Sequence, residues 1–279
     1  MSSTPRAYKS CRDALRCTGP DTEQFLQGQL SQEVSDLSDK ESVWSFLLNP
    51  NGKLAVWLRV TRIAKDHYLL DMEEGWGQLA FERLERFKIR VECHIEATQL
   101  QVVSILGEGA KKIRGELPST EITSDTGWPS LEGFDLLGES STLPSRCEIG
   151  TQEEYECLRI SHAIPRMGAE LIEGMIPAET NLIERSVSFT KGCYTGQELI
   201  ARLDSRGNNV PRNLCRILGN EVFITGAEIQ GLQRTVGVVT SAAHSVVGTI
   251  GLGYVSRSFE IPGRATIGDS SVMVESAFT

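Results

Sequence analysis

The chain has 279 residues, which at roughly 100–200 residues per domain predicts about two domains, each large enough to bury its own core. Its hydrophobic fraction of 40% and charged fraction of 23% are typical of a globular protein and exclude a disordered or collagen-like chain. The formal net charge of −9 argues against stable nucleic-acid binding, because an acidic surface repels a phosphate backbone.

Helix and strand signals in the first part of the chain follow an order that favours an α+β fold. A Gly-Pro break with a capping-box spacing starts the first helix, and an NPNG turn separates the first two strands. The elements predicted in chain order are a helix over 22–30, strands over 42–48, 54–61 and 67–71, a helix over 75–87, strands over 91–96 and 101–106, and a helix over 109–117. Residues 118–146 are expected to form loop or weak strand.

The composition changes from about Arg206 onward, where glycine becomes frequent and short β-branched runs appear. Such runs predict a small antiparallel barrel or sandwich. Its predicted strands cover 214–218, 235–240, 246–255 and 271–277. We therefore place a domain boundary near residue 205, which gives predicted domains of 1–205 and 206–279.

The distribution of apolar residues and cysteines indicates the compartment. No stretch approaches about 18 consecutive apolar residues, and the first eleven residues contain no apolar run, so we expect a cytoplasmic protein without a membrane span. The seven cysteines are scattered and contain no CxxC pair. Such spacing predicts reduced thiols and builds no zinc site or cluster-binding set, so we expect no bound metal.

One cysteine is set apart by its neighbours in residues 191–198, which read KGCYTGQE. Thr195 and Glu198 have the capping-box form, which predicts a fixed helix N-terminus directly after them. Cys193 would lie just outside the first turn, where the helix dipole and the cationic Lys191 favour the thiolate. We predict that Cys193 carries the chemistry, with Lys191 in support. The alternative is a buried cysteine with a structural role only.

The same eight residues resemble the signature of the YgfZ family, a branch of the GcvT-like folate-binding superfamily. The other segments similar to family motifs are 25–30 (FLQGQL), 49–53 (NPNGK), 159–168 and 176–179. The resemblance implies a GcvT-like folate-binding region with a C-terminal β-barrel-like domain, arranged around a central cleft. It also implies a cytosolic tetrahydrofolate-binding protein that supports iron–sulfur cluster assembly or repair, a role tied in bacteria to iron–sulfur tRNA-modifying enzymes.

The resemblance further implies which residues hold tetrahydrofolate or a one-carbon derivative of it. Tyr155 stands where a relative carries a tryptophan thought to touch folate, and an aromatic face can stack there. Arg159 suits the glutamyl carboxylates of folate through its fork geometry, and the alternative for it is a solvated helix residue. The remaining cofactor-binding residues that it implies are Glu179, Tyr194, Gln197, Glu198 and Arg202. The expected partners are folate and iron–sulfur client or assembly proteins.

Two other functions stay open at the level of sequence. A folate-dependent aminomethyltransferase of the glycine-cleavage type needs an aspartate near the start of the helix after the third strand, and a rough match places Gln78 there. Glutamine cannot act as a general base. A non-enzymatic scaffold, in which the folate cleft and Cys193 only organise protein partners, fits the same residues. An accessory factor is therefore favoured over an enzyme.

Overall fold

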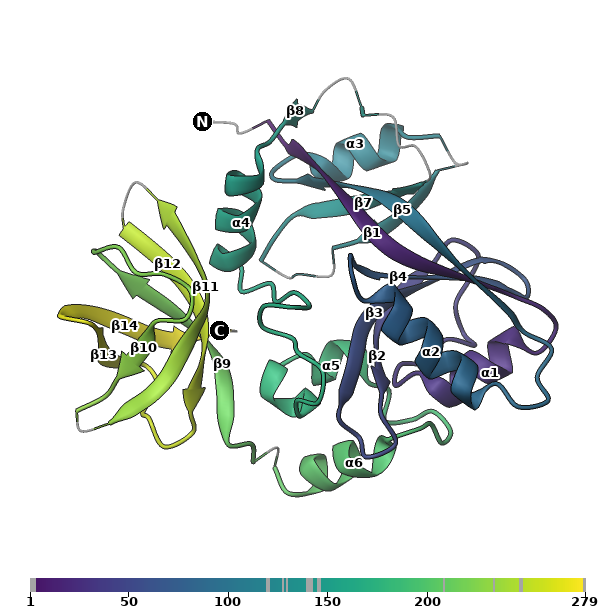
Figure 1. Cartoon of the computed structure of the whole chain (residues 1–279). Coiled ribbons are helices and arrows are strands. Elements are labelled where there is room, and N and C mark those ends of the chain that lie inside the picture. Colours follow the sequence, from purple (N-terminus) through teal and green to yellow (C-terminus); the bar gives the residue numbers. More distant parts are fainter. Residues whose placement is uncertain are drawn as a thin grey trace. The chain divides into compact units, whose positions relative to one another are not determined.

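The computed structural model describes residues 4–118, 121–126, 128, 130–138, 143–144, 147–207, 209–232, 234–245 and 248–277. These residues combine helices and strands and end in a closed antiparallel barrel, so the predicted α+β class is confirmed (Figure 1). By compactness the chain forms a first unit, Met1–Gly150 with Glu184–Leu199, and a second unit, Thr151–Ile183 with Ile200–Thr279. The boundary near residue 205 stays a prediction.

The first unit is built on one mixed sheet with the strand order β2-β3-β4-β1-β5-β7-β6, and β8 pairs parallel to β1. Its elements are β1 (Arg6–Thr18), α1 (Thr22–Gln29), β2 (Ser42–Leu48), β3 (Leu54–Ala64), β4 (His67–Glu73), α2 (Gly77–Phe87), β5 (His94–Leu106), α3 (Ala110–Glu116), β6 (Ile122–Asp125), β7 (Gly133–Gly138), β8 (Glu148–Ile149) and α5 (Ile183–Ser186), whose first residue falls in the second unit. The helices and strands predicted over 22–87 are confirmed.

Two strands of this sheet differ from the sequence prediction. β1 was not predicted, because Arg12, Asp13 and Arg16 interrupt its apolar pattern, yet it pairs with both β4 and β5. The two strands predicted over 91–96 and 101–106 are instead the single strand β5. The intervening residues stay extended because each of them pairs with β1, as Ala97 does with Leu15.

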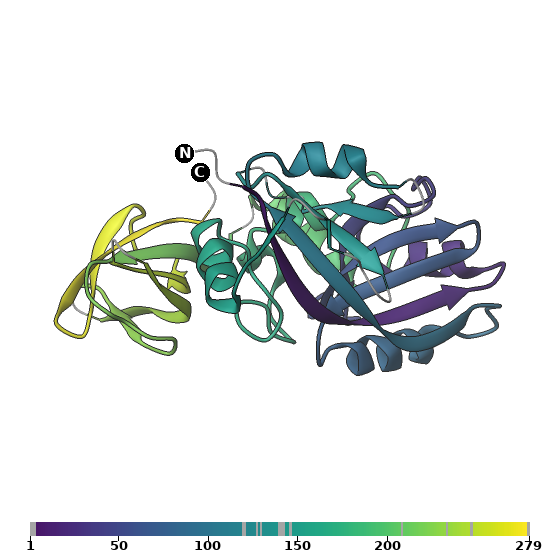
Figure 2. The ribbon, with the colours of Figure 1, turned by 90° about the horizontal axis from the view of Figure 1, so that it is seen from above.

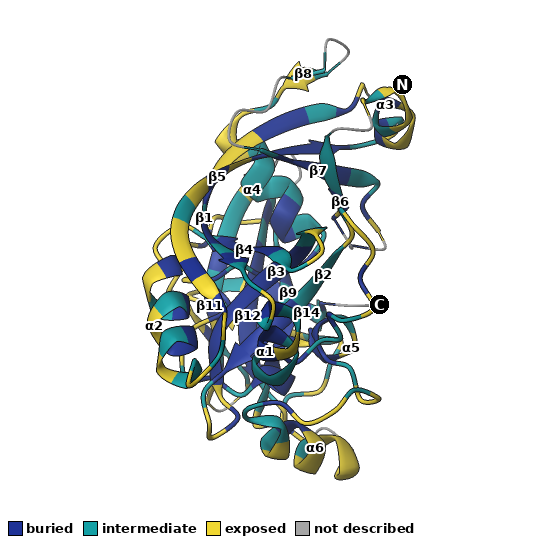
Figure 3. Ribbon diagram, turned by 90° about the vertical axis from the view of Figure 1, so that its right-hand side faces the viewer, coloured by how far each residue is buried: buried dark blue, intermediate teal, exposed yellow. Residues whose placement is uncertain are grey.

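The main core of the first unit lies where α1 and α2 cover the sheet. Phe25 and Leu26 of α1 and Ala80 and Leu84 of α2 pack in the same buried cluster as Leu58 of β3. Figure 3 shows α2 buried on one side and exposed on the other, as an amphipathic helix over a sheet requires. This packing fixes α1, which carries the first of the motifs singled out above.

The second unit contains the predicted barrel (Figure 2). Its strands close in the order β10-β11-β12-β9-β14-β13. Its elements are α4 (Gln152–Ser161), η1 (Pro177–Thr180), β9 (Arg212–Gly219), β10 (Glu228–Gln230), β11 (Thr235–Ser245), β12 (Gly248–Ser256), β13 (Gly263–Ile267) and β14 (Ser270–Ser276). The helix α6 (Gln197–Ser205) begins in the first unit and ends in the second.

The four barrel strands predicted from sequence correspond to β9, β11, β12 and β14, although residues 246 and 247 lie outside the described residues. The strands β10 and β13 were missed because they have only 3 and 5 residues. The barrel interior is filled by apolar side chains such as Ile217, Val239, Val255 and Val274. None of the helices in the described residues is long and apolar enough to cross a membrane.

Candidate functional site

Three segments that are far apart in the sequence meet in the first unit: the end of α1, the turn between β2 and β3, and residues 191–198. Lys191 makes the first of these contacts. Its ammonium group donates to the backbone oxygens of Leu30 at 2.9 Å and Gln32 at 2.7 Å, and to the side-chain oxygen of Gln27 at 3.1 Å. Backbone carbonyls at the end of a helix lack intrahelical partners and attract a cation. Lys191 therefore fastens the 191–198 segment to the C-terminal end of α1.

Thr195 makes the second contact with α1. Its backbone N–H donates to Gly28 O at 3.0 Å, and its hydroxyl donates to Gln29 Oε1 at 3.3 Å. The predicted capping box at Thr195 is wrong, because the helix α6 begins at Gln197, directly after Gly196, and no hydrogen bond joins Thr195 to Glu198 among the described residues. Instead the side-chain oxygen of Gln197 accepts from the N–H of Tyr194 at 3.2 Å.

Two glycines allow the turn between β2 and β3 to close against the same segment. Gly196 has a φ of +85°, and a Cβ on it would lie 2.6 Å from Asn49 O and 2.9 Å from Leu48 Cβ. Gly52 has a φ of +78°, and a Cβ on it would meet Leu199 and lie 2.8 Å from Gly196 O. A side chain fits at neither position, since the left-handed conformation and the close backbone approach both require glycine.

Cys193 is exposed, so the alternative prediction of a buried cysteine is wrong. A Cβ placed on the preceding Gly192 would meet no atom within 4 Å. The following Tyr194 is buried, with the Lys191 ammonium 5.5 Å from the centre of its ring, and burial raises the pKa of Tyr194 to about 12. The segment is thus anchored through Lys191, Tyr194 and Thr195 while the thiol faces solvent.

The burial of Lys191 has an electrostatic consequence. Desolvation lowers its pKa from 10.5 to about 8, against a smaller opposite effect of the Glu33 carboxylate. At neutral pH the ammonium is still charged, and its three acceptors are the oxygens near the end of α1. The geometry makes Lys191 a tether of the segment, and its electrostatic support of a thiolate at Cys193 stays a prediction.

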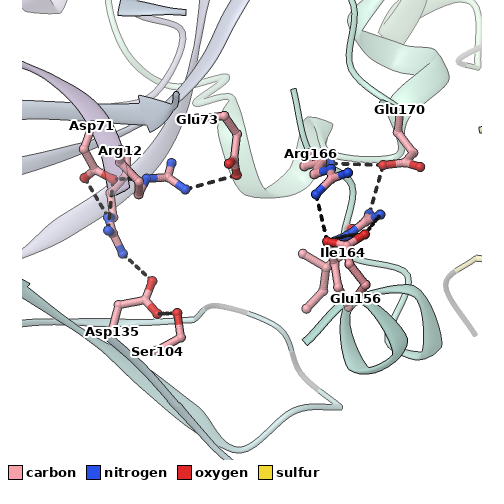
Figure 4. Close-up of polar contacts among 11 residues, drawn as sticks. Arg12, Asp71, Glu73, Ser104, Asp135, Glu156, Ile164, Arg166 and Glu170 are labelled. Carbon is pink, nitrogen blue, oxygen red and sulfur yellow. Dashed lines mark hydrogen bonds and ion pairs between the residues drawn. The ribbon is translucent and has the colours of Figure 1, made fainter. Parts of the chain in front are cut away.

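Arg159 lies at the centre of a buried network in the second unit, so its interpretation as a solvated helix residue is wrong. Nη1 donates to Ile164 O at 2.6 Å and Glu170 Oε2 at 3.0 Å, and Nη2 donates to Glu156 Oε2 at 3.0 Å and Ser241 Oγ at 2.8 Å. Nε donates to Glu156 at 3.3 Å, so every N–H of the guanidinium is used. Figure 4 shows its partners Glu156, Ile164 and Glu170 lying close to one another.

This network decides what Arg159 can do in its present conformation. A guanidinium binds a carboxylate of a ligand through N–H groups that are free to donate. For Arg159 to take the predicted role at the glutamyl carboxylates of folate, bonds to Glu156, Glu170 or Ser241 would have to open. The neighbouring Arg166 is more exposed, with 40% of its side chain accessible, and it also donates to Glu156, at 2.8 Å.

A second polar group of the second unit surrounds Glu179. Its carboxylate is buried and accepts from Arg212 Nε at 3.0 Å, while the Arg212 guanidinium lies 4.5 Å from the centre of the Tyr254 ring. The Tyr254 hydroxyl is buried and has no hydrogen-bond partner among the described residues. Burial first of all, with the carboxylates of Glu170 and Glu179, raises the pKa of Tyr254. Sequence reasoning found Glu179 but missed Arg212 and Tyr254.

The first unit holds a buried charge network that the sequence analysis did not single out. Arg59 is fully buried, with Nε 2.9 Å from Asp71 Oδ1 and Nη1 2.6 Å from Asp135 Oδ2, and Arg12 Nε donates to Asp71 Oδ2 at 2.6 Å (Figure 4). Burial alone would raise the pKa of Asp71, but the guanidinium groups of Arg59 and Arg12 outweigh it and lower that pKa. The sequence feature that could have revealed this network is Arg59, because an arginine inside an apolar strand must be paired when it is buried.

The residues predicted from sequence for the site are divided between the two units. Lys191, Cys193, Tyr194, Gln197 and Glu198 belong to the first unit, and the structure brings the segment that holds them together with α1 and the β2–β3 turn. The second unit holds Tyr155 and Arg159 on α4, Glu179 on η1 and the exposed Arg202 on α6. The cofactor-binding roles of these residues stay predictions.

The chain is similar in sequence to several bacterial proteins, although no protein-family model matches it. It is 29% identical over 217 residues to the tRNA-modifying protein YgfZ of Photorhabdus laumondii and 27% identical over 215 residues to that of Klebsiella pneumoniae. These matches span 70% and 69% of the chain but only 65% of each relative, which is less than two thirds of their length. An uncharacterized protein of Haemophilus influenzae is 26% identical over 237 residues, 82% of the chain and 81% of that relative.

A solved structure extends the likeness to the fold. The glycine cleavage system aminomethyltransferase T of Bartonella henselae superposes with a TM-score of 0.81, at 19% identity, over 97% of this chain and 85% of its own. Identity at this level shows the fold alone. The predicted resemblance is therefore confirmed: by sequence the chain is a relative of the YgfZ proteins, and by structure it has the fold of the glycine-cleavage aminomethyltransferase.

Proposed function

We propose that the chain is a tetrahydrofolate-binding protein that supports iron–sulfur cluster assembly or repair in the cytoplasm, with Cys193 as its reactive residue. The observation that carries the proposal is the convergence of three family motifs on one place in the first unit, where they hold the backbone around Cys193 and leave its thiol exposed. The relatives named tRNA-modifying protein YgfZ support the extension to enzymes that modify tRNA.

The chemistry of an exposed thiol on an anchored segment suits this role. Thiolates are the usual protein ligands of iron–sulfur clusters and are also nucleophiles toward other sulfur atoms. The backbone beside Cys193 is open at Gly192, so a second protein can approach the sulfur closely. An iron–sulfur cluster or sulfur atom bound at Cys193 is a substrate that is passed to another protein. The partners are iron–sulfur client or assembly proteins.

Folate binding is proposed for the second unit through Glu179 and Tyr155. A buried carboxylate can accept two neighbouring N–H groups of a pterin ring, and Glu179 Oε2 already accepts from Arg212 while its Oε1 has no hydrogen-bond partner among the described residues. Tyr155 on α4 offers an aromatic face for stacking. Arg159 contributes either by rearranging its bonds or by holding α4 against β11 through Ser241.

The aminomethyltransferase alternative gains nothing from the local geometry at Gln78. Its amide nitrogen donates to Glu82 Oε1 at 2.7 Å on the surface of α2, and an amide cannot take up a proton as a general base. We therefore keep the accessory function as the one proposal.

The proposal is tested by replacing Cys193 with Ser in cells that lack the native protein, with Cys11→Ser as the matched control at another exposed cysteine. Cys193→Ser should lose most of the activity of iron–sulfur tRNA-modifying enzymes, read as the level of the modified nucleoside, while Cys11→Ser should retain it. Full activity of Cys193→Ser would reject the role of the thiol.

Folate binding is tested separately by calorimetry with tetrahydrofolate. Glu179→Gln should weaken binding by about 1.5–3 kcal/mol if the carboxylate accepts charge-assisted hydrogen bonds from the pterin. Glu198→Gln, at an exposed position of the first unit, provides a comparison with another predicted cofactor-binding residue. Absence of heat with the wild-type protein would reject folate binding and leave the proposal for Cys193 standing.

A further inference from the structure

We propose that the C-terminal barrel carries a second binding site, on the outer face of β12, β9, β14 and β13, for a small organic anion with an apolar body. These four strands are consecutive neighbours in the barrel. The site lies wholly in the second unit and contains neither Cys193 nor Glu179. It is therefore independent of the proposed function.

A cavity of about 720 Å³ marks the place. Volumes of roughly 300–1,000 Å³ are typical of small-molecule sites. The apolar side chains of Leu218, Ile250 and Met273 line it, together with polar groups that include Asn220 and Thr249. An apolar floor with a few convergent polar groups is the usual composition of a ligand pocket.

The register of the barrel places the key side chains in one row. Ile250 of β12 pairs with Leu218 of β9, Leu218 pairs with Met273 of β14, and Met273 pairs with Arg264 of β13. Directly paired residues of antiparallel strands project from the same face. Because neighbouring strands lie about 4.8 Å apart, the three apolar residues span about 10 Å before the row reaches the arginine.

The charges around the row favour an anion at its end. Arg264 is exposed and has no ion-pair or hydrogen-bond partner in the described part of the chain, and none of the lining residues is acidic. Arg216, one step along β9 on the same face, is already neutralised by Glu275 at 3.1 Å and donates to Ser161 O at 3.2 Å. Arg264 thus offers its N–H groups to a ligand, and a guanidinium fork matches carboxylate or phosphate.

The row and the charge together define the ligand class. An apolar body of about 10 Å covers three paired side chains, and one anionic group reaches the fourth. A nucleic acid is disfavoured, because the chain carries a net charge of −9 and repels a polyanion. The ligand is a monoanionic or dianionic small molecule, such as a medium-chain carboxylate or an aryl phosphate.

The test uses the full chain and the fluorescent probe 1-anilinonaphthalene-8-sulfonate, which has an aromatic body and one sulfonate. Wild-type protein should bind it saturably, and Arg264→Glu should weaken binding at least about tenfold, with a smaller loss for Arg264→Lys. Arg257→Glu is the matched control, because Arg257 is an exposed arginine of the same barrel outside this cavity. Equal binding by wild type, Arg264→Glu and Arg257→Glu would overturn the proposal.

Competition distinguishes an amphipathic ligand from a bare anion. Octanoate should displace the probe at far lower concentration than inorganic phosphate, and Met273→Gln should weaken octanoate binding without changing the circular dichroism spectrum. Displacement by phosphate as effective as by octanoate would show a simple anion site and would overturn the assignment of the apolar row. Displacement by octanoate that is unchanged in Met273→Gln and Arg264→Glu would place the ligand elsewhere.

Discussion

The segment at Cys193 and the network at Arg159 were both singled out from sequence, but they use their polar groups in opposite ways. In the Cys193 segment, Lys191 and Thr195 donate hydrogen bonds to oxygens at the C-terminal end of α1, and the thiol between them is exposed. At the second, the arginine expected to meet a ligand makes all of its bonds inside the unit. A residue in a sequence motif can thus be available to a ligand or can hold the structure around it, and its contacts show which of the two applies.

The largest effect is expected from breaking the network, with Arg159→Met. The change would leave the carboxylate of Glu170, whose side chain is 0% exposed, buried without its counter-charge. Removing one partner of a buried pair typically costs about 3–5 kcal/mol. Urea unfolding followed by circular dichroism measures the loss.

The control for this change is Arg166→Met, whose side chain is 40% exposed and pairs with Glu156. Exposed pairs are worth about 0–1 kcal/mol, so this variant should unfold close to the wild type. Equal stability of both variants would contradict the interpretation of Arg159 as a structural residue and would leave the predicted folate-binding role open for it.

The next largest effect on stability is expected in the Cys193 segment, where Gly196→Ala is compared with Gly192→Ala. Alanine at 196 would adopt a strained positive φ and approach Asn49 O and Leu48 Cβ, whereas alanine at 192 meets open space. Strain of this kind costs about 1–3 kcal/mol. Tryptophan fluorescence during urea unfolding reports on the first unit, because Trp44, Trp57, Trp76 and Trp128 all lie there.

The two glycine variants should also differ in function. Gly196→Ala should reduce the proposed support of iron–sulfur enzymes together with stability, and Gly192→Ala should preserve stability. A stable Gly196→Ala protein would mean that the β2–β3 turn does not hold the segment as the contacts indicate.

The sequence predicted most of this arrangement because each strong signal was local. The helix over 22–30, the NPNG turn and the barrel strands follow from turn residues and from the spacing of apolar side chains, which do not depend on distant partners. The KGCYTGQE segment was found as a motif, and Cys193 within it is exposed, while its reactive role stays a prediction.

The errors arose where a distant partner overrides a local preference. Thr195 has the spacing of a helix cap, but its donations to the oxygens of Gly28 and Gln29 hold it against α1, and the helix α6 begins only at Gln197. The strand β1 carries charges that pattern analysis assigns to the surface, yet Arg12 is buried against Asp71. The Arg12–Asp71 pair joins residues 59 positions apart and the Thr195–Gly28 pair joins residues 167 positions apart, and a window of ten residues contains neither pair.

A smaller effect on stability is expected from Lys191, and this effect depends on pH. Its pKa falls from 10.5 to about 8 on folding, so between these values the unfolded chain binds a proton that the folded chain has released. Stability contributed by this group therefore rises as the pH increases from about 8 to about 10.5 and is lost as the pH falls. Lys191→Met should lack this increase, measured as the difference between the two urea midpoints at pH 7.5 and pH 10.

Lys191→Met also tests the tether directly at neutral pH. Loss of the three bonds to Gln27, Leu30 and Gln32 should speed hydrogen exchange in residues 191–198, and Lys191→Arg should restore part of the protection. Unchanged exchange in Lys191→Met would show that Thr195 and the glycines hold the segment without the lysine.

The smallest effect on stability is expected for Cys193→Ser, and it completes the comparison with Arg159. The exposed thiol supports no packing, so the free energy of unfolding should change by less than about 0.5 kcal/mol. The same thiol should react with an alkylating agent at neutral pH faster than the buried Cys17 and Cys215, and also faster than the exposed Cys11 if its surroundings favour the thiolate. Mass spectrometry of alkylation against pH gives the four rates in one experiment. A rate equal to that of Cys11 would leave Cys193 exposed but not activated, and a large loss of stability in Cys193→Ser would make it a structural residue like Arg159.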